Sequence, residues 1–384
     1  MRQIKIILLI LISLLIKLGC IESYLPKDIL ESDENYVVWG RVTNNRDYHL
    51  VIVSKTSSLE YPKNIGISGC DVSIVDSDNN VFVSETQTIA GEYFVKIEHE
   101  HLTVGKAFKV VVITPDGVHI ESAYDSLRPC PDIKDLYVQR VDKPTTNPLD
   151  VERGIQFKVD LDADNSYGRY YNWEMEVTYE YRSTYPITHY YNGEINELLK
   201  PDYSLFYCWQ TEQIKDFFPL STKNLYDNKY LGHQLHFVNN RSQRLQYGYS
   251  VLLFQSAISE GYFNFLDQIK RNSNDQEGIF GSQPIGVIGN LYSTSDPEKK
   301  VLGFFSVENV RSRRFFFQNI MDVPFEIPFT CTPYMPLQGF AAFPPEEYPL
   351  YLTIDQDGLL GIVSKSCVDC RILGGSTIKP IFWP

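Results

Sequence analysis

Strict alternation of apolar and charged side chains over residues 171–181 is the feature that most constrains the fold of this chain. The odd-numbered positions are aromatic or aliphatic, whereas Glu174, Glu176 and Glu180 occupy three of the even-numbered ones. A period of two places these sets on opposite faces of a β-strand, while a helix with this pattern would have no apolar face. The segment therefore predicts a strand with one buried and one charged face.

Further short apolar runs, each bounded by Gly, Asn, Asp or Pro, indicate strands before this segment. Turn signals such as Asn44-Asn45 and Asp116-Gly117 separate the runs. The runs are Val37–Val42, His49–Val53, Val72–Val75, Val81–Ser84, Tyr93–Ile97, Phe108–Ile113 and Val118–Ser122. Strands so closely spaced predict a small N-terminal β-sandwich over residues 36–128. The order Val-x-Ile, Asp-Asn-Asn, Gly-Glu-Tyr and Gly-Lys-Ala-Phe-x-Val-x-Val resembles carboxypeptidase-regulatory-like and related immunoglobulin-like modules. In such modules the Tyr after the Gly packs at a sheet corner, which the resemblance implies for Tyr93.

Residues 129–384 are expected to form a larger β-sandwich domain with a short helical insertion. The strand-like runs are Gly154–Leu161, Tyr171–Tyr181, Leu235–Val238, Tyr249–Phe254, Val301–Val307, Arg313–Phe317, Leu350–Ile354 and Gly361–Val363. A helix is predicted over residues 259–271, because Ser259 can cap its start and Tyr262, Phe265, Leu266 and Ile269 share one face. A second short helix is predicted over residues 211–218.

Composition excludes two classes of protein. In the 384 residues, 43% hydrophobic content with 22% charged residues excludes a disordered chain. A net charge of −13 argues against broad nucleic-acid binding, because neutralising phosphates requires clustered Lys and Arg. The 26 Tyr and 22 Phe also favour strands over helices.

The N-terminus has the pattern of an export signal. Arg2 and Lys5 precede an apolar run from Ile6 to Ile16, which is too short to span a bilayer, and Gly19-Cys20 follows. A small residue before cysteine is typical of bacterial lipoproteins, so we expect a signal peptide over 1–19 and lipidation of Cys20. A single-pass anchor or an ordinary cleaved signal is the alternative. The acidic segment 20–35 is expected to be a solvated tether.

The cysteines predict disulfides in an oxidising compartment. Lipidation of Cys20 leaves six others, which are Cys70, Cys130, Cys208, Cys331, Cys367 and Cys370. By domain proximity we pair Cys70 with Cys130, and Cys208 with one of the three C-terminal cysteines (Cys331, Cys367 and Cys370). The spacing Cys367-Val-Asp-Cys370 also fits a redox pair or half a zinc site. Because a βαβ context and a second tight pair are missing, we expect structural disulfides or free thiols there.

No motif in the sequence establishes a catalytic or metal site. The acids of Asp160–Asn165 alternate as in a calcium loop, but the required Gly and the final bidentate Glu are missing. His99-Glu100-His101 and His233-x-x-His236 lack a third ligand nearby, and neither a Gly-x-Ser-x-Gly elbow nor a phosphate-binding loop is present. We therefore expect no enzyme activity, no cofactor and no metal.

Aromatic residues gather in a segment that reads as a loop. The segment includes Tyr185, which precedes Pro186, and also His189, Tyr190 and Tyr191, which lie between Pro186 and Asn192-Gly193. Such residues can stack on sugars or anchor a protein partner. Alternatively they close the end of the sandwich core, the interpretation we favour. The segment Phe343–Tyr348 carries the same two alternatives.

Several short motifs in a fixed order resemble a known family. They include Tyr170-Tyr171-Asn172-Trp173, Cys208-Trp209, Gln283-Pro284, Gly289-Asn290, Val301–Phe305 and the ending Cys367-x-x-Cys370-Arg371…Lys379-Pro380-x-Phe382-Trp383. Together with the lipoprotein signal they resemble the Bacteroidota family called domain of unknown function 4249. The resemblance implies an outer-membrane lipoprotein, often facing the cell surface, whose genes commonly lie beside TonB-dependent receptors. Only Glu22 supplies an acid close to Cys20, so a periplasmic orientation stays open.

The expectation from the sequence is a non-catalytic envelope lipoprotein. It would be held on the outer membrane by its lipid and would act as an accessory or substrate-binding subunit of a TonB-dependent receptor. A stand-alone glycan-binding or adhesion lipoprotein is the first alternative, and an exported hydrolase is the second. Nucleic acid is not an expected partner.

Overall fold

A computed structural model of the chain describes residues 35–57, 63, 65–87, 89–145, 147, 150–275, 287–318, 331–354 and 357–384. The predicted signal peptide, Cys20 and nearly all of the tether lie outside these residues. Among the described residues, no helix is long and apolar enough to cross a membrane.

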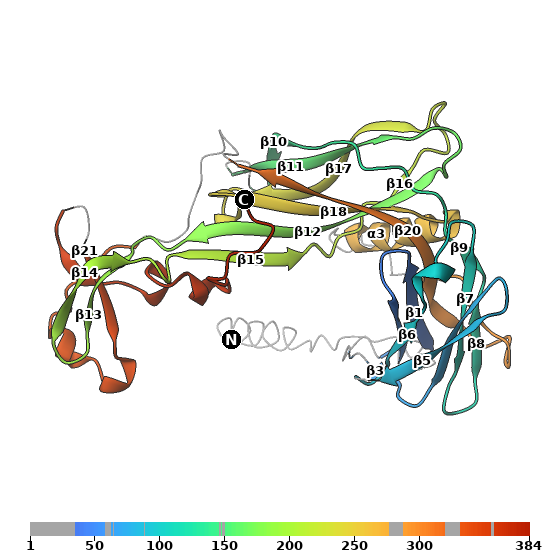
Figure 1. Cartoon of the computed structure of the whole chain (residues 1–384), viewed down its shortest axis with the longest axis horizontal. Helices are drawn as coiled ribbons and strands as arrows, with labels where there is room; N and C mark the ends of the chain where they lie inside the picture. The colour runs from blue at the N-terminus through green and yellow to red at the C-terminus, as the bar shows by residue number, and fades with distance from the viewer. Residues whose placement is uncertain are drawn as a thin grey trace, which may run out of the picture.

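The structure is built mostly of β-strands, as expected, and extends along one axis (Figure 1). An N-terminal sandwich lies at one end, a central sandwich follows, and a small distal sheet lies at the opposite end. The strands of the first two units form one continuous hydrogen-bonded path.

The N-terminal sandwich confirms the predicted strands of the first region. Its strands are β1 (Tyr36–Thr43), β2 (Tyr48–Lys55), β3 (Ile65–Gly66), β4 (Asp71–Asp76), β5 (Val81–Gln87), β6 (Glu92–Lys96), β7 (Ala107–Ile113), β8 (His119–Ser122) and β9 (Asp125–Ser126). Tyr93 supports a sharp corner: its hydroxyl donates to the Ile67 carbonyl at 2.7 Å and accepts from the Cys70 N–H at 2.9 Å. The segment His99–His101 is a 3₁₀ turn.

The central unit packs two sheets face to face. One sheet has the order β15 (Tyr207–Gln213), β12 (Tyr170–Arg182), β18 (Tyr249–Ala257) and β20 (Val301–Phe317), with β16 (Leu220–Ser221) at its edge. The other has the order β10 (Leu136–Pro144), β11 (Val151–Asp162) and β17 (Lys229–Asn239). A 3₁₀ turn, Gln243–Leu245, precedes β18.

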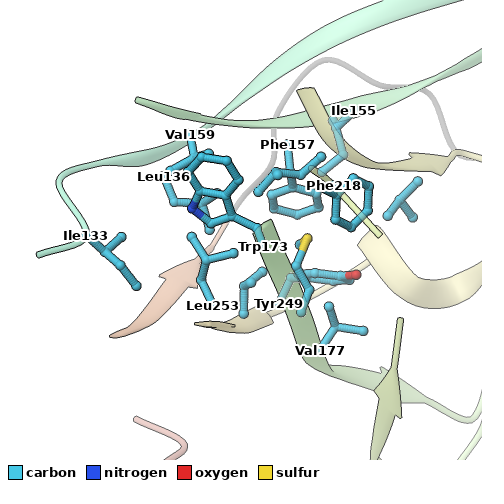
Figure 2. Packing of buried hydrophobic residues seen from close by; sticks show 14 of the residues in the cluster. Ile133, Leu136, Ile155, Phe157, Val159, Trp173, Val177, Phe218, Tyr249 and Leu253 are labelled. Atoms are coloured by element: carbon cyan, nitrogen blue, oxygen red, sulfur yellow. The ribbon is translucent and has the colours of Figure 1, made fainter. Parts of the chain in front are cut away.

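The core of the central unit forms where the inner faces of these sheets meet. Figure 2 shows Phe157 and Val159 of β11 facing Trp173 of β12 and Tyr249 and Leu253 of β18. The Trp173 indole N–H donates to the Gln255 side-chain oxygen at 3.0 Å, which satisfies the one polar atom that the ring buries. The odd-numbered positions of 171–181 are therefore buried, as the alternation predicted.

Strand β20 joins the N-terminal and central sandwiches into one continuous sheet. Residues Val301–Glu308 pair in parallel with β1, and Asn309–Phe317 pair antiparallel with β18. At about 3.3 Å per residue, such a strand is roughly 56 Å long. The two predicted runs Val301–Val307 and Arg313–Phe317 are thus one strand.

The N-terminal sandwich also draws on segments far from the expected 36–128 range. Besides β20, strand β19 (Leu291–Ser293) pairs with β8, and Leu291, Val301 and Phe305 lie in the N-terminal core. Local patterns identified β20 but carried no information about which sheets it would join, and β19 was not among the predicted strands.

Helix α3 (Glu260–Asp275) confirms the helix predicted over 259–271. The Ser259 hydroxyl accepts from the Tyr262 N–H at 3.2 Å as an N-cap, and Tyr262, Phe265 and Leu266 pack against Phe304. The helix predicted over 211–218 is wrong, because this segment begins in β15, whose pairing with β12 overrides the helical spacing of its apolar residues.

The distal sheet has the order β14 (Ile195–Asp202), β13 (Ile187–Tyr191), β21 (Leu350–Ile354) and β22 (Leu360–Ile362). Short 3₁₀ turns accompany it at Phe340–Ala342, Pro345–Glu347, Lys365–Cys367 and Cys370–Leu373. The aromatic segment expected to be a loop is therefore mostly strand β13, whose side chains alternate between buried and half-buried.

Disulfides tie the C-terminal segment to this end of the molecule. Cys208 bonds to Cys370, which confirms its expected C-terminal partner, and Cys331 bonds to Cys367. Each cysteine of Cys367-Val-Asp-Cys370 has a different partner, so they form neither a redox pair nor half a zinc site. The pairing of Cys70 with Cys130 is wrong: both are buried free thiols, and Cys130 lies against the Gln255 backbone of the central unit.

Candidate functional site

A cleft lies at the inner corner where the N-terminal sandwich meets the central sheet. Strand β20 runs through this corner and sets the β1–β2 face beside the outer face of β12 and β18. The cleft has a volume of about 470 Å³, which is within the usual range of ligand sites, about 300–1,000 Å³. It is lined by Trp39, Arg41, Thr43, Asn45, Arg46, Tyr48, His49, Leu50, Ile52, Glu174, Glu176, Gln213, Phe254 and Val310.

Strand alternation explains why these side chains reach the cleft. In β1, Trp39 and Arg41 alternate with the buried Val38 and Val42 and therefore point away from the N-terminal core. In β12, Glu174 and Glu176 are half-buried and lie on the face opposite the Trp173 ring. The charged face predicted for this strand thus forms one wall of the cleft.

A buried ion cluster fixes the corner. Arg41 Nη1 lies 2.7 Å from a Glu174 carboxylate oxygen, and Arg41 Nη2 lies 2.7 Å from Glu308. Glu308 is fully buried, and the Ser306 hydroxyl donates to it at 2.9 Å. The cluster therefore links β1, β12 and β20, three strands from two sandwiches.

The cluster shifts the pKa values of its members. Burial raises the pKa of Glu308 above its usual range, and the positive charge of Arg41 opposes that rise. Burial acts to lower the pKa of Arg41, but the carboxylates of Glu308 and Glu174 outweigh it, so the pKa is raised and the guanidinium stays charged.

A second ion pair lies on the same face of the central sheet as Glu174. Arg314 Nη2 lies 3.3 Å from Glu176, and its guanidinium stacks 3.6 Å from the ring centre of Phe382 near the C-terminus. The C-terminal residues therefore border the outer face of the same sheet, where Trp383 packs edge-on against Phe316.

Polar atoms without hydrogen-bond partners accompany the cleft. Among the described residues, Arg41 Nε and Thr43 Oγ1 are buried without a partner, and so is Nε2 of His49. Burial, with the nearby Arg46 charge, lowers the pKa of His49 to about 4, so its ring is neutral at pH 7. Its Nδ1 accepts from the Thr43 N–H at 3.4 Å. The β1–β2 wall therefore contains buried polar atoms that have no hydrogen-bond partner.

The four aromatic-segment residues named from sequence do not form one surface. His189 and Tyr191 are buried, and the Tyr185 hydroxyl donates to the Cys331 carbonyl at 2.6 Å. Tyr190 is half-buried and lies opposite Tyr351 in the sheet.

Tyr190 and Tyr351 line a distal pocket of about 570 Å³. Its other walls are Ile187, Asn192, Leu198, Asp202, Ser204, Leu205, Pro349 and Arg371. In the segment Phe343–Tyr348, both end residues pack against the core of the distal sheet.

The acidic side chains of segment 160–165 contact other groups of the protein. Asp160 accepts from the Gly232 N–H at 2.7 Å and the Tyr137 hydroxyl at 3.1 Å, while Asp162 pairs with Lys229 at 2.8 Å. Across the described part of the chain, no group of three or more His, Cys, Asp or Glu residues is placed to hold a metal ion.

Comparison with known proteins assigns the chain to a family. The family described as Domain of unknown function (DUF4249) matches residues 22–314. The chain belongs to this DUF4249 family. The matched range includes every residue that lines the corner cleft, whereas β21, β22 and the C-terminal cysteines of this DUF4249 protein lie beyond it.

Other comparisons add little. No curated protein matches. Among solved structures, a DUF4785 family protein from Legionella pneumophila is 11% identical, with a TM-score of 0.18. The match covers 56% of this chain and 49% of the other, so the chain spans about half the length of that protein.

Sequence reasoning missed Trp39, Arg41 and Glu308. Glu174 and Glu176 of β12 were visible as part of an alternating face, but their partners Arg41 and Arg314 lie more than 130 residues away in the chain. A lone Arg within the run Val37–Val42 was the one local sign that this strand had a polar outer face.

Proposed function

We propose that this DUF4249 protein is a non-catalytic lipoprotein of the cell envelope that binds cargo in the corner cleft. It would act as an accessory subunit of a TonB-dependent outer-membrane receptor and would be held on that membrane through a lipid on Cys20. The observation that carries the binding role is the cleft itself, which combines the aromatic side chains of Trp39, Tyr48 and Phe254 with fixed charged groups such as the Arg41–Glu174 pair.

Two features support an exported location. The N-terminal residues have the pattern of a lipoprotein signal. The disulfides Cys208–Cys370 and Cys331–Cys367 require an oxidising environment to form and persist, such as the bacterial periplasm or the cell surface.

The geometry suits capture rather than large-scale closure. Strand β20 is hydrogen-bonded in both sandwiches, and the Arg41 cluster braces the corner between them. A site between units joined in this way is pre-organised, so little ordering is required when cargo binds.

A pull-down tests the receptor partnership. Tagged full-length protein is purified in mild detergent from its own membranes, and partners are identified by mass spectrometry. We expect a TonB-dependent barrel in near-stoichiometric amount, and we expect Cys20→Ser to release the protein from the membrane fraction. Protein that is acylated on Cys20 but brings down no barrel would contradict the partnership.

A stand-alone glycan-binding or adhesion role is the second candidate. The distal pocket supports it, because Tyr190 and Tyr351 present neighbouring rings beside the polar Asn192 and Ser204. In this case Tyr190→Ala abolishes retention on immobilised glycans, whereas alanine at the isolated, exposed Tyr226 does not.

A further inference from the structure

The corner cleft has two walls of different chemistry. The β1–β2 wall presents Trp39, Leu50 and Ile52, and Phe254 of β18 adds another apolar face. The β12–β15 wall presents Glu174, Glu176 and Gln213. A ligand that fits both walls has an apolar face and a polar edge.

The charges around the cleft are balanced. Arg41 and Arg46 oppose Glu174 and Glu176, and the pairs Arg41–Glu174 and Glu176–Arg314 already neutralise most of this charge. A charged ligand would lose its hydration on entering the cleft. Because the charged side chains there are already paired, no free opposite charge would compensate that loss, so the cleft is not suited to an anion or a cation.

The paired carboxylates nevertheless keep acceptor capacity. The side chains of Glu174 and Glu176 are 21% and 32% exposed, and each carboxylate accepts more hydrogen bonds than its Arg partner uses. Gln213 and Asn45 each supply both donors and acceptors. Hydroxyl groups, which donate and accept at once, match such a set, and those that donate to a carboxylate form the stronger charge-assisted type.

We infer that the corner cleft binds a neutral sugar. The apolar C–H face of a pyranose ring would lie against the β1–β2 wall and Phe254. Its hydroxyl edge would face Glu174, Glu176 and Gln213 on the β12–β15 wall. The inference rests on the proposed binding function and names the ligand class of that same site. Glu308 is not a ligand in this scheme; it positions Arg41, which in turn holds Glu174.

Full-length protein in detergent is screened against immobilised neutral trisaccharides of glucose, mannose, galactose, xylose and N-acetylglucosamine. Trimers of galacturonate and glucosamine serve as the charged comparison. Any neutral sugar retained is then titrated by calorimetry. We expect a neutral trimer to bind, with an affinity that changes less than twofold between 50 and 500 mM NaCl because no ion pair forms.

Variants identify the site. Tyr48→Ala and Gln213→Ala alter exposed residues of the cleft rim, so the fold should be retained, and each should weaken binding about tenfold. Tyr190→Ala, in the distal pocket, is the matched aromatic control and should change the affinity less than twofold.

Three results would overturn the inference: no neutral trimer binds, charged trimers alone bind, or Tyr190→Ala abolishes binding while Tyr48→Ala does not. The last result would favour the distal glycan site. Recovery of a receptor barrel together with any of these results would leave the proposed accessory role intact, whereas a missing barrel with sugar binding intact would remove only that role.

Discussion

Replacing Arg41 with methionine tests the buried ion cluster that fixes the corner. Methionine keeps most of the hydrocarbon stem, so the main change is the loss of a positive charge 2.7 Å from the fully buried Glu308. Removing one partner of a buried ion pair costs about 3–5 kcal/mol of unfolding free energy, because the other charge stays buried without compensation. The Ser306 hydroxyl still donates to Glu308, and Arg41 is partly exposed at its Glu174 end, so we expect about 3 kcal/mol.

The loss should depend on pH, with a defined sign. Burial holds the pKa of Glu308 in the folded state above its unfolded value, so folding takes up a proton, and stability falls as pH rises through that interval. Without Arg41 the pKa rises further, since the charge that opposed the rise is gone. The deficit of Arg41→Met should therefore be smallest below the unfolded-state pKa of Glu308 and should grow as pH rises above it.

Urea unfolding followed by tryptophan fluorescence at pH 4.5, 6.0 and 7.5 measures this effect. The double variant Arg41→Met/Glu308→Gln should recover most of the stability at pH 7.5, because the uncompensated charge is removed. Lys223→Met is the control: its pair with Glu260 has both side chains more than half exposed, so its loss should be within about 0.5 kcal/mol. An unchanged midpoint for Arg41→Met at pH 7.5, or a larger deficit at pH 4.5, would refute the reasoning.

Three further predictions concern the scaffold. Gly303→Ala should destabilise the protein by at least about 2 kcal/mol in the same urea assay, because φ is +99° and a Cβ atom would lie 2.0 Å from the Val38 carbonyl oxygen. Tyr93→Phe should cost about 1–3 kcal/mol, because it removes the hydroxyl that accepts from the buried Cys70 N–H and donates to the half-buried Ile67 carbonyl; a change below about 0.5 kcal/mol would contradict this. Burial raises the pKa of Cys130 to about 12, so iodoacetamide at pH 8 should label it only after unfolding; mass spectrometry detects the label.

Local patterns predicted individual elements well where a single face decides the structure. The alternation over 171–181 identified β12, and the spacing around Ser259 identified α3, because in each case one side chain in two or in three to four must reach a core. The expected bond between Cys208 and a C-terminal cysteine was confirmed.

Predictions failed where a distant segment decided the outcome. Residues 211–218 have helical spacing, but β15 is held by its register with β12. Cys70 and Cys130 were paired by domain proximity, yet they are buried in different environments as free thiols. The aromatic segment reads as a loop because of its Pro and Asn-Gly boundaries, but it is strand β13, which pairs with β14 across the Asn192-Gly193 turn and with β21, more than 150 residues later.

The sequence by itself determined that the chain is a β protein with an amphipathic helix over residues 259–271, because periodicity and turn residues act over a few neighbouring positions. Only the tertiary structure decided that β20 belongs to both sandwiches, and that Arg41, Glu174 and Glu308 meet at the corner between them. The physical reason is that strand pairing uses backbone hydrogen bonds, which every strand offers equally. The choice of partner therefore depends on the summed packing of whole sheets rather than on any local motif.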